Sequence, residues 1–325
     1  MRRSLLLWGN TPYGIASTDT VFAVRTDGSG FSTLHGFTAP DAITGANSDG
    51  DRPFGGLILS SNTLFGTTVN GGGAGNGTVF AVNTDGSGFT NLYSFSPLSG
   101  GWEGTNRDGA YPAAGLLLSG NTLYGTAQSG GGSGQGAVFA LNTDGSGFTT
   151  LHHFSVTRTN SSGVFTNGDG TAPLAALLLS GSSLYGTAFG GGGFGAGTVY
   201  GLNTDGSGFQ ILHPFDGQSD GGIPNAGLIL SCNKLYGTAY RGGSSDNGTV
   251  FTLSLPPPRL TLMSSASNII LTWPTNSTGF TLQSATNLGP GAVWNTNSPA
   301  LVVVNGQYPV TNPISGTRQF FRLSQ

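Results

Sequence analysis

The 325-residue sequence is poor in charge. Charged residues make up 8% of the chain, against about 25% in an average soluble protein. The net charge is −3, and the single lysine, Lys234, and the ten arginines are scattered along the chain. Because no cationic patch is available to neutralise phosphates or anionic lipid headgroups, we expect neither nucleic acid nor a membrane surface among the partners.

Cysteine is almost absent, and long apolar runs and helical periodicity are missing. The single cysteine, Cys232, excludes an internal disulfide framework and a cysteine-based metal cluster. No segment approaches 18 consecutive apolar residues, so we expect no membrane span. The segment 1–8 begins like a signal peptide, but the apolar run ends at Gly9 without a small-residue cleavage site, and we interpret it as part of the fold.

Glycine is the most unusual component that is present. It accounts for 58 residues, about 18% of the chain against a usual 7%. Aromatic residues nevertheless make up 10%, so apolar material for a core exists and the chain should fold.

Internal repetition organises the first 253 residues. The string Thr-Asp-Gly-Ser-Gly-Phe occurs four times, with its aspartate at positions 27, 85, 144 and 205. Leu-(Tyr/Phe)-Gly-Thr recurs at positions 64, 123, 184 and 235, and a Val-(Phe/Tyr) pair ends at positions 22, 80, 139, 200 and 251. These marks define five repeats, at residues 5–37, 56–95, 115–154, 176–215 and 227–253. The last repeat stops early.

Each complete repeat has the pattern of four short strands. In the third repeat we predict strands at 115–119, 121–127, 136–142 and 147–154, separated by glycine-containing turns. Four-stranded meanders must bury both faces, and radial packing about an axis achieves this. The fold class is therefore all-β: a closed β-propeller of about five four-stranded blades. An open solenoid and a truncated larger ring are the alternatives.

The repeat also resembles a known family. The stretch "GNTLYGTA…GGG…GAVFALNTDGSGFTTLHHF" at 120–154 is similar to the Gloeo-Verruco (GloVer) tandem repeat of exported bacterial proteins, and the resemblance covers about residues 5–253. It implies an extracellular or cell-surface location and a separate sorting or anchoring module at the C-terminus. It brings no established activity.

A second domain follows the repeats. The repeat domain, 1–255, ends at a proline linker, 256–258, after which the marks disappear. Residues 259–325 alternate like strands, predicted at 259–263, 268–274, 280–285, 292–295, 300–304 and 319–323. We predict a small β-sandwich of immunoglobulin or fibronectin-III type with Trp273 in its core. The stretch "ILTWPTNSTGFTLQSATNL" resembles a C-terminal β-module of exported proteins from the same bacterial groups.

Strand alternation places two sets of loops on one face of the propeller. These are the glycine-rich loops at 70–77, 129–136, 190–197 and 241–248, and the variable loops at 38–55, 96–114, 155–175 and 216–226. Binding residues commonly lie on irregular loops held by a rigid scaffold. We therefore expect a binding surface on this face.

The repeated acids and histidines favour structural roles. Two aspartates recur in the repeats, at 27, 85, 144 and 205 and at 49, 108, 169 and 220. Asp before Gly in a tight turn explains them through local bonds, whereas a calcium loop would need a glutamate that is missing. The histidines at 35, 152 and 213 occupy one repeat position, where the second repeat has Tyr93, so we expect a role in blade packing or at the solvent edge, and no metal or cofactor.

One loop gathers polar and aromatic residues, namely Trp102, Glu103, Arg107, Asp108 and Tyr111. An aromatic ring beside a carboxylate and a guanidinium is a common way to hold a sugar. Four residues on the same predicted face could contribute: Asp51, Arg52, Arg241 and Asp246. The structural alternative is a solvated loop with Trp102 folded over the blade.

The sequence favours a non-catalytic extracellular or cell-surface binding or adhesion protein, with a glycan or a surface protein as partner. One alternative is a carbohydrate-active hydrolase or lyase that uses loop carboxylates such as Glu103 or Asp108. Another is a structural surface or matrix protein. The low surface charge also predicts self-association.

Overall fold

The computed structural model describes residues 5–16, 19–101, 104–256, 258–265, 267–274, 280–296, 304, 307–313 and 318–324. All regular elements in these ranges are strands. The chain divides into two compact units, each described by itself: 1–178, 185–228 and 237–251 form the first, and 179–184, 229–236 and 252–325 form the second.

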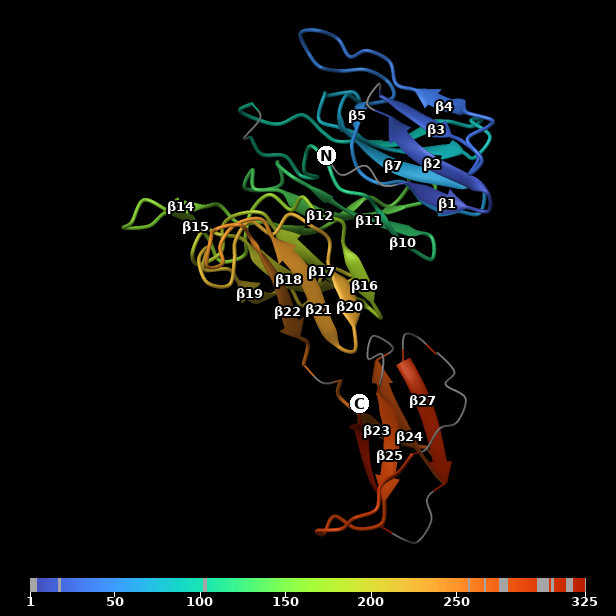
Figure 1. Ribbon diagram of the computed structural model, residues 1–325, viewed down its shortest axis with the longest axis vertical. Coiled ribbons are helices and arrows are strands. Elements are labelled where there is room, and N and C mark those ends of the chain that lie inside the picture. Colours follow the sequence, from blue (N-terminus) through green and yellow to red (C-terminus); the bar gives the residue numbers. More distant parts are fainter. Residues whose placement is uncertain are drawn as a thin grey trace. The chain divides into compact units, whose positions relative to one another are not determined.

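Three sheets have four strands in sequential order (Figure 1). The first contains β1 (Leu6–Trp8), β2 (Thr11–Ala16), β3 (Thr20–Ala23) and β4 (Ser32–Gly36). The third contains β10 (Leu117–Ser119), β11 (Thr122–Ala127), β12 (Ala137–Asn142) and β13 (Thr149–His153). The fourth contains β16 (Leu178–Ser180), β17 (Ser183–Ala188), β18 (Thr198–Asn203) and β19 (Gln210–Pro214). The four strands predicted for the third repeat are confirmed, and every strand end agrees to within two residues.

The second and fifth sheets vary this plan. The second has β6 (Ile58–Ser60), β7 (Thr63–Asn70), β8 (Thr78–Asn83) and β9 (Thr90–Ser94), with β5 (Asp51–Pro53) also paired to β7. The fifth has only β20 (Ile229–Ser231), β21 (Lys234–Ala239) and β22 (Thr249–Ser254). A small hairpin of β14 (Arg158–Thr159) and β15 (Phe165–Thr166) lies within a variable loop, where no strand was predicted.

Each sheet packs one apolar face on the next sheet. Val79, Ala81 and Phe65 of the second sheet share a core with Leu123, Phe139 and Leu141 of the third. The equivalent residues Val21, Ala23 and Tyr13 of the first sheet meet Leu64, Phe80 and Val82 of the second. We call the face turned toward the following sheet the trailing face, and the face turned toward the preceding sheet the leading face. Strand alternation produces both faces from one repeat.

Small residues bring the inner segments of the sheets together around an axis. Gly55, Ala114, Ala175 and Gly227 line a common cavity of about 400 Å³. Buried threonines also cross between sheets: the Oγ1 of Thr67 donates to the Ala114 carbonyl at 2.9 Å, and Thr126 donates to the Ala175 carbonyl at 3.2 Å. Radially packed four-stranded meanders of this kind are the blades of a β-propeller, as predicted.

The closure predicted between the first and last sheets is not seen among the described residues. Leu5 on the leading face of the first sheet and Val250 on the trailing face of the fifth are both exposed. The four packing steps between the five sheets therefore do not bring these two faces together, because the packing between neighbouring sheets, and not the number of repeats, sets the rotation at each step.

The C-terminal region forms two three-stranded sheets. One contains β23 (Thr261–Ser265), β24 (Asn268–Pro274) and β27 (Gln307–Pro313); the other contains β25 (Thr281–Ala285), β26 (Asn295–Thr296) and β28 (Phe320–Ser324). Trp273 is buried with Leu271, Leu282 and Val310, as predicted. The strand predicted at 300–304 lies mostly outside the described residues, and β27 was not predicted. The immunoglobulin or fibronectin-III type stays a prediction.

A glycine in the middle of β11 makes room for an aromatic ring and offers a test of the packing. A Cβ on Gly125 would lie 2.4 Å from Cζ of Phe139, which is fully buried. We expect Gly125→Ala to lower the free energy of unfolding by about 1–3 kcal/mol, because the ring has no free space to enter. Urea unfolding followed by circular dichroism measures this.

Gly73→Ala is the matched control, since nothing lies within 4 Å of a Cβ at that position. Its effect should stay within about 0.5 kcal/mol. Equal stability of the two variants would contradict the proposed packing role of Gly125.

Candidate functional site

The aspartates of the Thr-Asp-Gly-Ser turns act locally, as predicted. Oδ1 of Asp85 accepts hydrogen bonds from the backbone N–H of Ser87 at 2.9 Å and from its hydroxyl at 2.6 Å. The same pair of bonds recurs at Asp27, Asp144 and Asp205. These bonds, led by the serine hydroxyl, hold the pKa of each carboxyl below its ordinary value.

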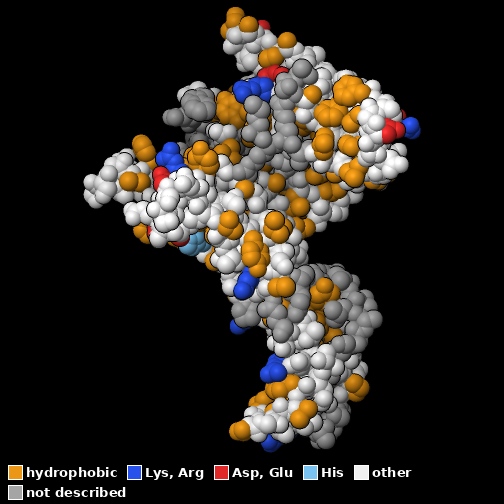
Figure 2. Space-filling view, in the orientation of Figure 1, with side chains coloured by type: hydrophobic (Ala, Val, Ile, Leu, Met, Phe, Trp, Pro, Cys, Tyr) orange, Lys and Arg blue, Asp and Glu red, His pale blue; other side chains and the backbone are white. Residues whose placement is uncertain are grey.

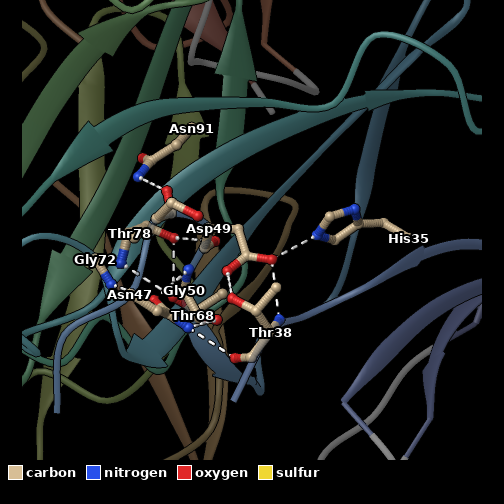
Figure 3. A network of polar contacts seen from close by, with 10 residues as sticks. His35, Thr38, Asn47, Asp49, Gly50, Thr68, Gly72, Thr78 and Asn91 are labelled. Atoms are coloured by element: carbon tan, nitrogen blue, oxygen red, sulfur yellow. Dashed lines mark hydrogen bonds and ion pairs between the residues drawn. The ribbon is translucent and has the colours of Figure 1, made fainter. Parts of the chain in front are cut away.

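The second set of aspartates joins distant segments, which corrects the prediction of local turns. Asp49 is buried and accepts from His35 Nε2 at 3.1 Å, from the Thr38 backbone N–H at 3.0 Å and from the Thr38 hydroxyl at 2.5 Å (Figure 3). Its partners lie 14 and 11 residues away in the sequence. A buried carboxylate needs such donors, so the carboxylate fastens the variable loop to the outer strand of its sheet.

The same network recurs in the other repeats. Asp108 accepts from the Tyr93 hydroxyl at 2.7 Å and the Ser96 backbone N–H at 2.8 Å. His152 Nε2 lies 3.1 Å from Asp169, and His213 Nε2 lies 2.7 Å from Asp220. Burial and the bond to Asp108 raise the pKa of Tyr93. Burial raises the pKa of Asp169, but the bonds from His152 and its serine neighbour outweigh this, so the net shift is downward.

The histidine position packs between sheets, as predicted. The His35 ring stacks on Phe89 of the following sheet with centroids 3.5 Å apart, and His152 stacks on Phe209 at 3.6 Å. Tyr93 makes the equivalent contact with Phe148 at 3.9 Å. Each of these rings therefore links a carboxylate of its own repeat to an aromatic ring of the next.

Asparagine side chains connect the variable loops to the glycine-rich loops. Asn47 donates from Nδ2 to the Thr38 and Gly50 carbonyls, each at 2.8 Å, and its Oδ1 accepts from the backbone N–H of Gly50 at 2.9 Å and of Gly72 at 2.8 Å (Figure 3). Asn106 and Asn167 repeat this arrangement. The two loop sets therefore share one face, as predicted, and the asparagine side chains hold their backbones together.

A groove opens on this face between the loops of the third and fourth sheets. It has a volume of about 450 Å³, and the aromatic rings of Phe165 and Phe189 contribute to its lining. The polar side chains that line it carry no charge, namely Gln128, Ser129, Gln135, Thr157 and Thr171. An aromatic surface beside amides and hydroxyls suits an uncharged ligand with many hydroxyl groups.

The structure divides the predicted site residues among different places. Trp102 and Glu103 lie outside the described residues. Arg107 and Asp108 line a shallow pocket of about 360 Å³ that also contains Tyr93. Asp108 is buried and bonded within its repeat, so its carboxylate is part of the internal network.

The remaining predicted residues do not gather around that pocket. Asp246 lines a separate pocket of about 640 Å³ and accepts from the Gly242 backbone N–H at 2.8 Å. Asp51 and Arg52 belong to β5, and Arg241 pairs through its backbone with Gly222. Burial raises the pKa of Tyr111, whose backbone N–H donates to the Asn76 carbonyl of the preceding sheet at 2.8 Å.

Two features were missed at the sequence level. The pairing of Asp49 with His35 had a signal, because both residues recur at fixed repeat positions, with tyrosine replacing histidine where Asp108 pairs with Tyr93. The groove had none, because Gln128 and Phe165 come from loops of different length in two repeats.

Two further kinds of feature do not occur in the described part of the chain. There, no group of three or more histidine, cysteine, aspartate or glutamate side chains is arranged to hold a metal ion. Nor does any helix in these ranges have the length and hydropathy needed to cross a membrane.

The sheets, their packing around an axis and the shared loop face together define a β-propeller protein. The chain belongs to the Gloeobacter/Verrucomicrobia repeat family, whose model matches residues 20–164 and 156–284. No curated protein matches it.

Solved structures of low identity are similar over most of the chain. A chain of the nidogen/laminin complex is 14% identical with a TM-score of 0.41, covering 81% of this chain and 84% of that one. BamB from Moraxella catarrhalis is 14% identical with a TM-score of 0.40, covering 82% and 68%. A gluconolactonase from Xanthomonas campestris is 13% identical with a TM-score of 0.42, covering 80% and 78%.

The internal role of Asp108 can be tested by truncation. Asp108→Ala leaves the Tyr93 hydroxyl and the Ser96 backbone N–H without their acceptor. We expect the free energy of unfolding to fall by about 2–4 kcal/mol, measured by urea unfolding. Asp144→Ala, in an exposed turn, is the control and should cost much less; an equal loss for both variants would argue against the network.

The network also predicts a dependence of stability on pH. The pKa of Asp169 lies below its ordinary value of 3.8 in the folded protein, so its contribution is present above pH 3.8 and is lost as the pH falls through the folded pKa. We expect Asp169→Asn to be less stable at neutral pH, and the difference from the wild type to shrink below pH 3.8. Thermal unfolding between pH 2 and 7 measures this, with Asp51→Asn as the control. A difference that grows on acidification would contradict the prediction.

Proposed function

We propose that this protein binds an uncharged glycan on the loop face of its propeller, without catalysis, outside the cell or at its surface. The observation that carries the proposal is the groove between the third and fourth sheets. The polar side chains that line the groove carry amide and hydroxyl groups, and two phenylalanine side chains form part of its apolar lining. A sugar presents hydroxyl groups at its edge and apolar C–H groups on its face, which fit amides and an aromatic ring respectively.

The hydrogen bonds that the aspartates accept favour binding over hydrolysis. Glycoside hydrolysis needs two carboxyl groups on either side of one bond. The repeated aspartates of the described repeats accept hydrogen bonds from their own turns or from the outer strands, as at Asp85 and Asp49. They are therefore committed to the scaffold, which supports a role in holding the loops.

A rigid loop backbone also favours recognition. The asparagine bonds fix the glycine-rich loops before any ligand arrives, as Asn167 does by accepting from Gly192 at 2.8 Å. A surface that is already in its bound shape loses less conformational entropy on binding. Weak but specific binding of neutral oligosaccharides is the expected behaviour.

A glycan array followed by calorimetry on the best ligand tests the proposal. Phe165 lines the groove, so Phe165→Ala should weaken binding at least tenfold by removing the aromatic surface. Gln128→Ala should weaken it less, because one amide is lost. Phe194→Ala is the matched control: this phenylalanine is exposed in the glycine-rich loop 190–197, whose glycines 190, 191 and 195 line the groove, but its own side chain does not line it, so its loss should leave affinity unchanged.

Two outcomes would count against the proposal. An array without ligands, or equal effects of Phe165→Ala and Phe194→Ala, would remove the groove as the binding site. Release of reducing ends from the bound glycan, abolished by Glu103→Gln while binding persists, would establish the hydrolase alternative.

A further inference from the structure

The trailing face of each of the first four sheets is covered by the sheet that follows it. In the part of the chain that the structure describes, the trailing face of the fifth sheet has no such cover. Val250 is 82% exposed, whereas its repeat equivalents Val21, Val79, Val138 and Val199 are each 0% exposed. Ile229 and Tyr236 of the same sheet are exposed as well. Apolar side chains that are normally buried between sheets therefore face solvent here.

The hydrogen-bonding group of this face is free too. Thr67, Thr126 and Thr187 are buried, and each donates its hydroxyl to a carbonyl of the following sheet. Thr238 occupies the same position in the fifth sheet, where it is exposed. Among the described residues, its hydroxyl has no acceptor.

The leading face of the first sheet shows the complementary exposure. Leu5 is 64% exposed, whereas its equivalents Leu57, Leu116, Leu177 and Leu228 are at most 7% exposed. Phe31 is 63% exposed, although Phe89, Phe148 and Phe209 stack on a ring of the preceding sheet. Hydrophobic side chains gather on the visible side of the region that β1 and β2 occupy (Figure 2).

We propose that the trailing face of the fifth sheet binds the leading face of the first sheet of a second copy of this chain. A second copy is the partner that fits, because consecutive sheets within the chain already pack a trailing face on a leading face. Leu5, Phe31 and Val250 belong to the same compact unit and are all exposed, so these parts of the two faces do not cover each other within it. The small net charge of −3 adds little repulsion between copies.

The contact uses different surfaces on the two copies and is therefore heterologous. Each copy keeps one free face after the first contact, so assembly continues beyond the dimer with rising concentration. This head-to-tail growth distinguishes the proposal from a symmetric dimer, in which one face pairs with itself.

Sedimentation velocity of the full chain with two single variants tests the proposal. Val250→Glu places a charge on the trailing face and Leu5→Glu places one on the leading face; both side chains are exposed, so folding should persist, as circular dichroism will show. We expect the average mass of the wild type to rise with concentration and each variant alone to stay monomeric. An equimolar mixture should form dimers and nothing larger, because one intact face of each kind remains.

Ile43→Glu is the control, since Ile43 is 94% exposed in a variable loop away from both faces, and it should associate like the wild type. The chain carrying both Val250→Glu and Leu5→Glu should associate with neither single variant. A wild type that stays monomeric at every concentration would overturn the proposal, with the C-terminal region or another protein as the cover. Loss of association in only one variant would indicate a symmetric contact and would also overturn it.

Discussion

The packing of one sheet face on the next is the interaction on which the propeller depends. It requires every repeat to carry two different apolar faces, which the period-2 alternation of a strand provides. It also requires glycine where a neighbouring aromatic ring crosses the strand, as at Gly125 beside Phe139. A low content of charge is a consequence, because both faces of each inner sheet are buried and the turns need glycine and small polar residues.

The same constraint explains how the few acids are used. A carboxylate near the outer strand is partly buried by the loop above it, so it must receive hydrogen bonds, and Asp49, Asp108 and Asp169 receive them from histidine or tyrosine and from serine or threonine. The rings that donate also stack on the next sheet, as His152 does on Phe209. The bonds of the carboxylates and the packing between repeats thus reinforce each other, and the groove between the third and fourth sheets is lined by uncharged side chains.

Much of the fold followed from repetition, and the differences have physical causes. The strands of the third repeat were predictable because alternation and turn residues recur together, and Trp273 was predictable as a large apolar residue in a strand. The strand β27, Gln307–Pro313, was missed because its prolines and polar residues resemble a loop. The bonds of Asp49 were missed because Asp-Gly in a turn explains the same residue with fewer assumptions.

The sequence by itself determined the repeat, its strands and turns and the two loop sets on one face, because these depend on neighbours in the chain. Only the tertiary structure decided which aspartates bond at a distance, where a groove opens and which faces stay uncovered. Those outcomes depend on the angle at which one sheet packs on the next, and that angle arises from side-chain contacts between residues about 60 positions apart, a separation that local patterns do not encode.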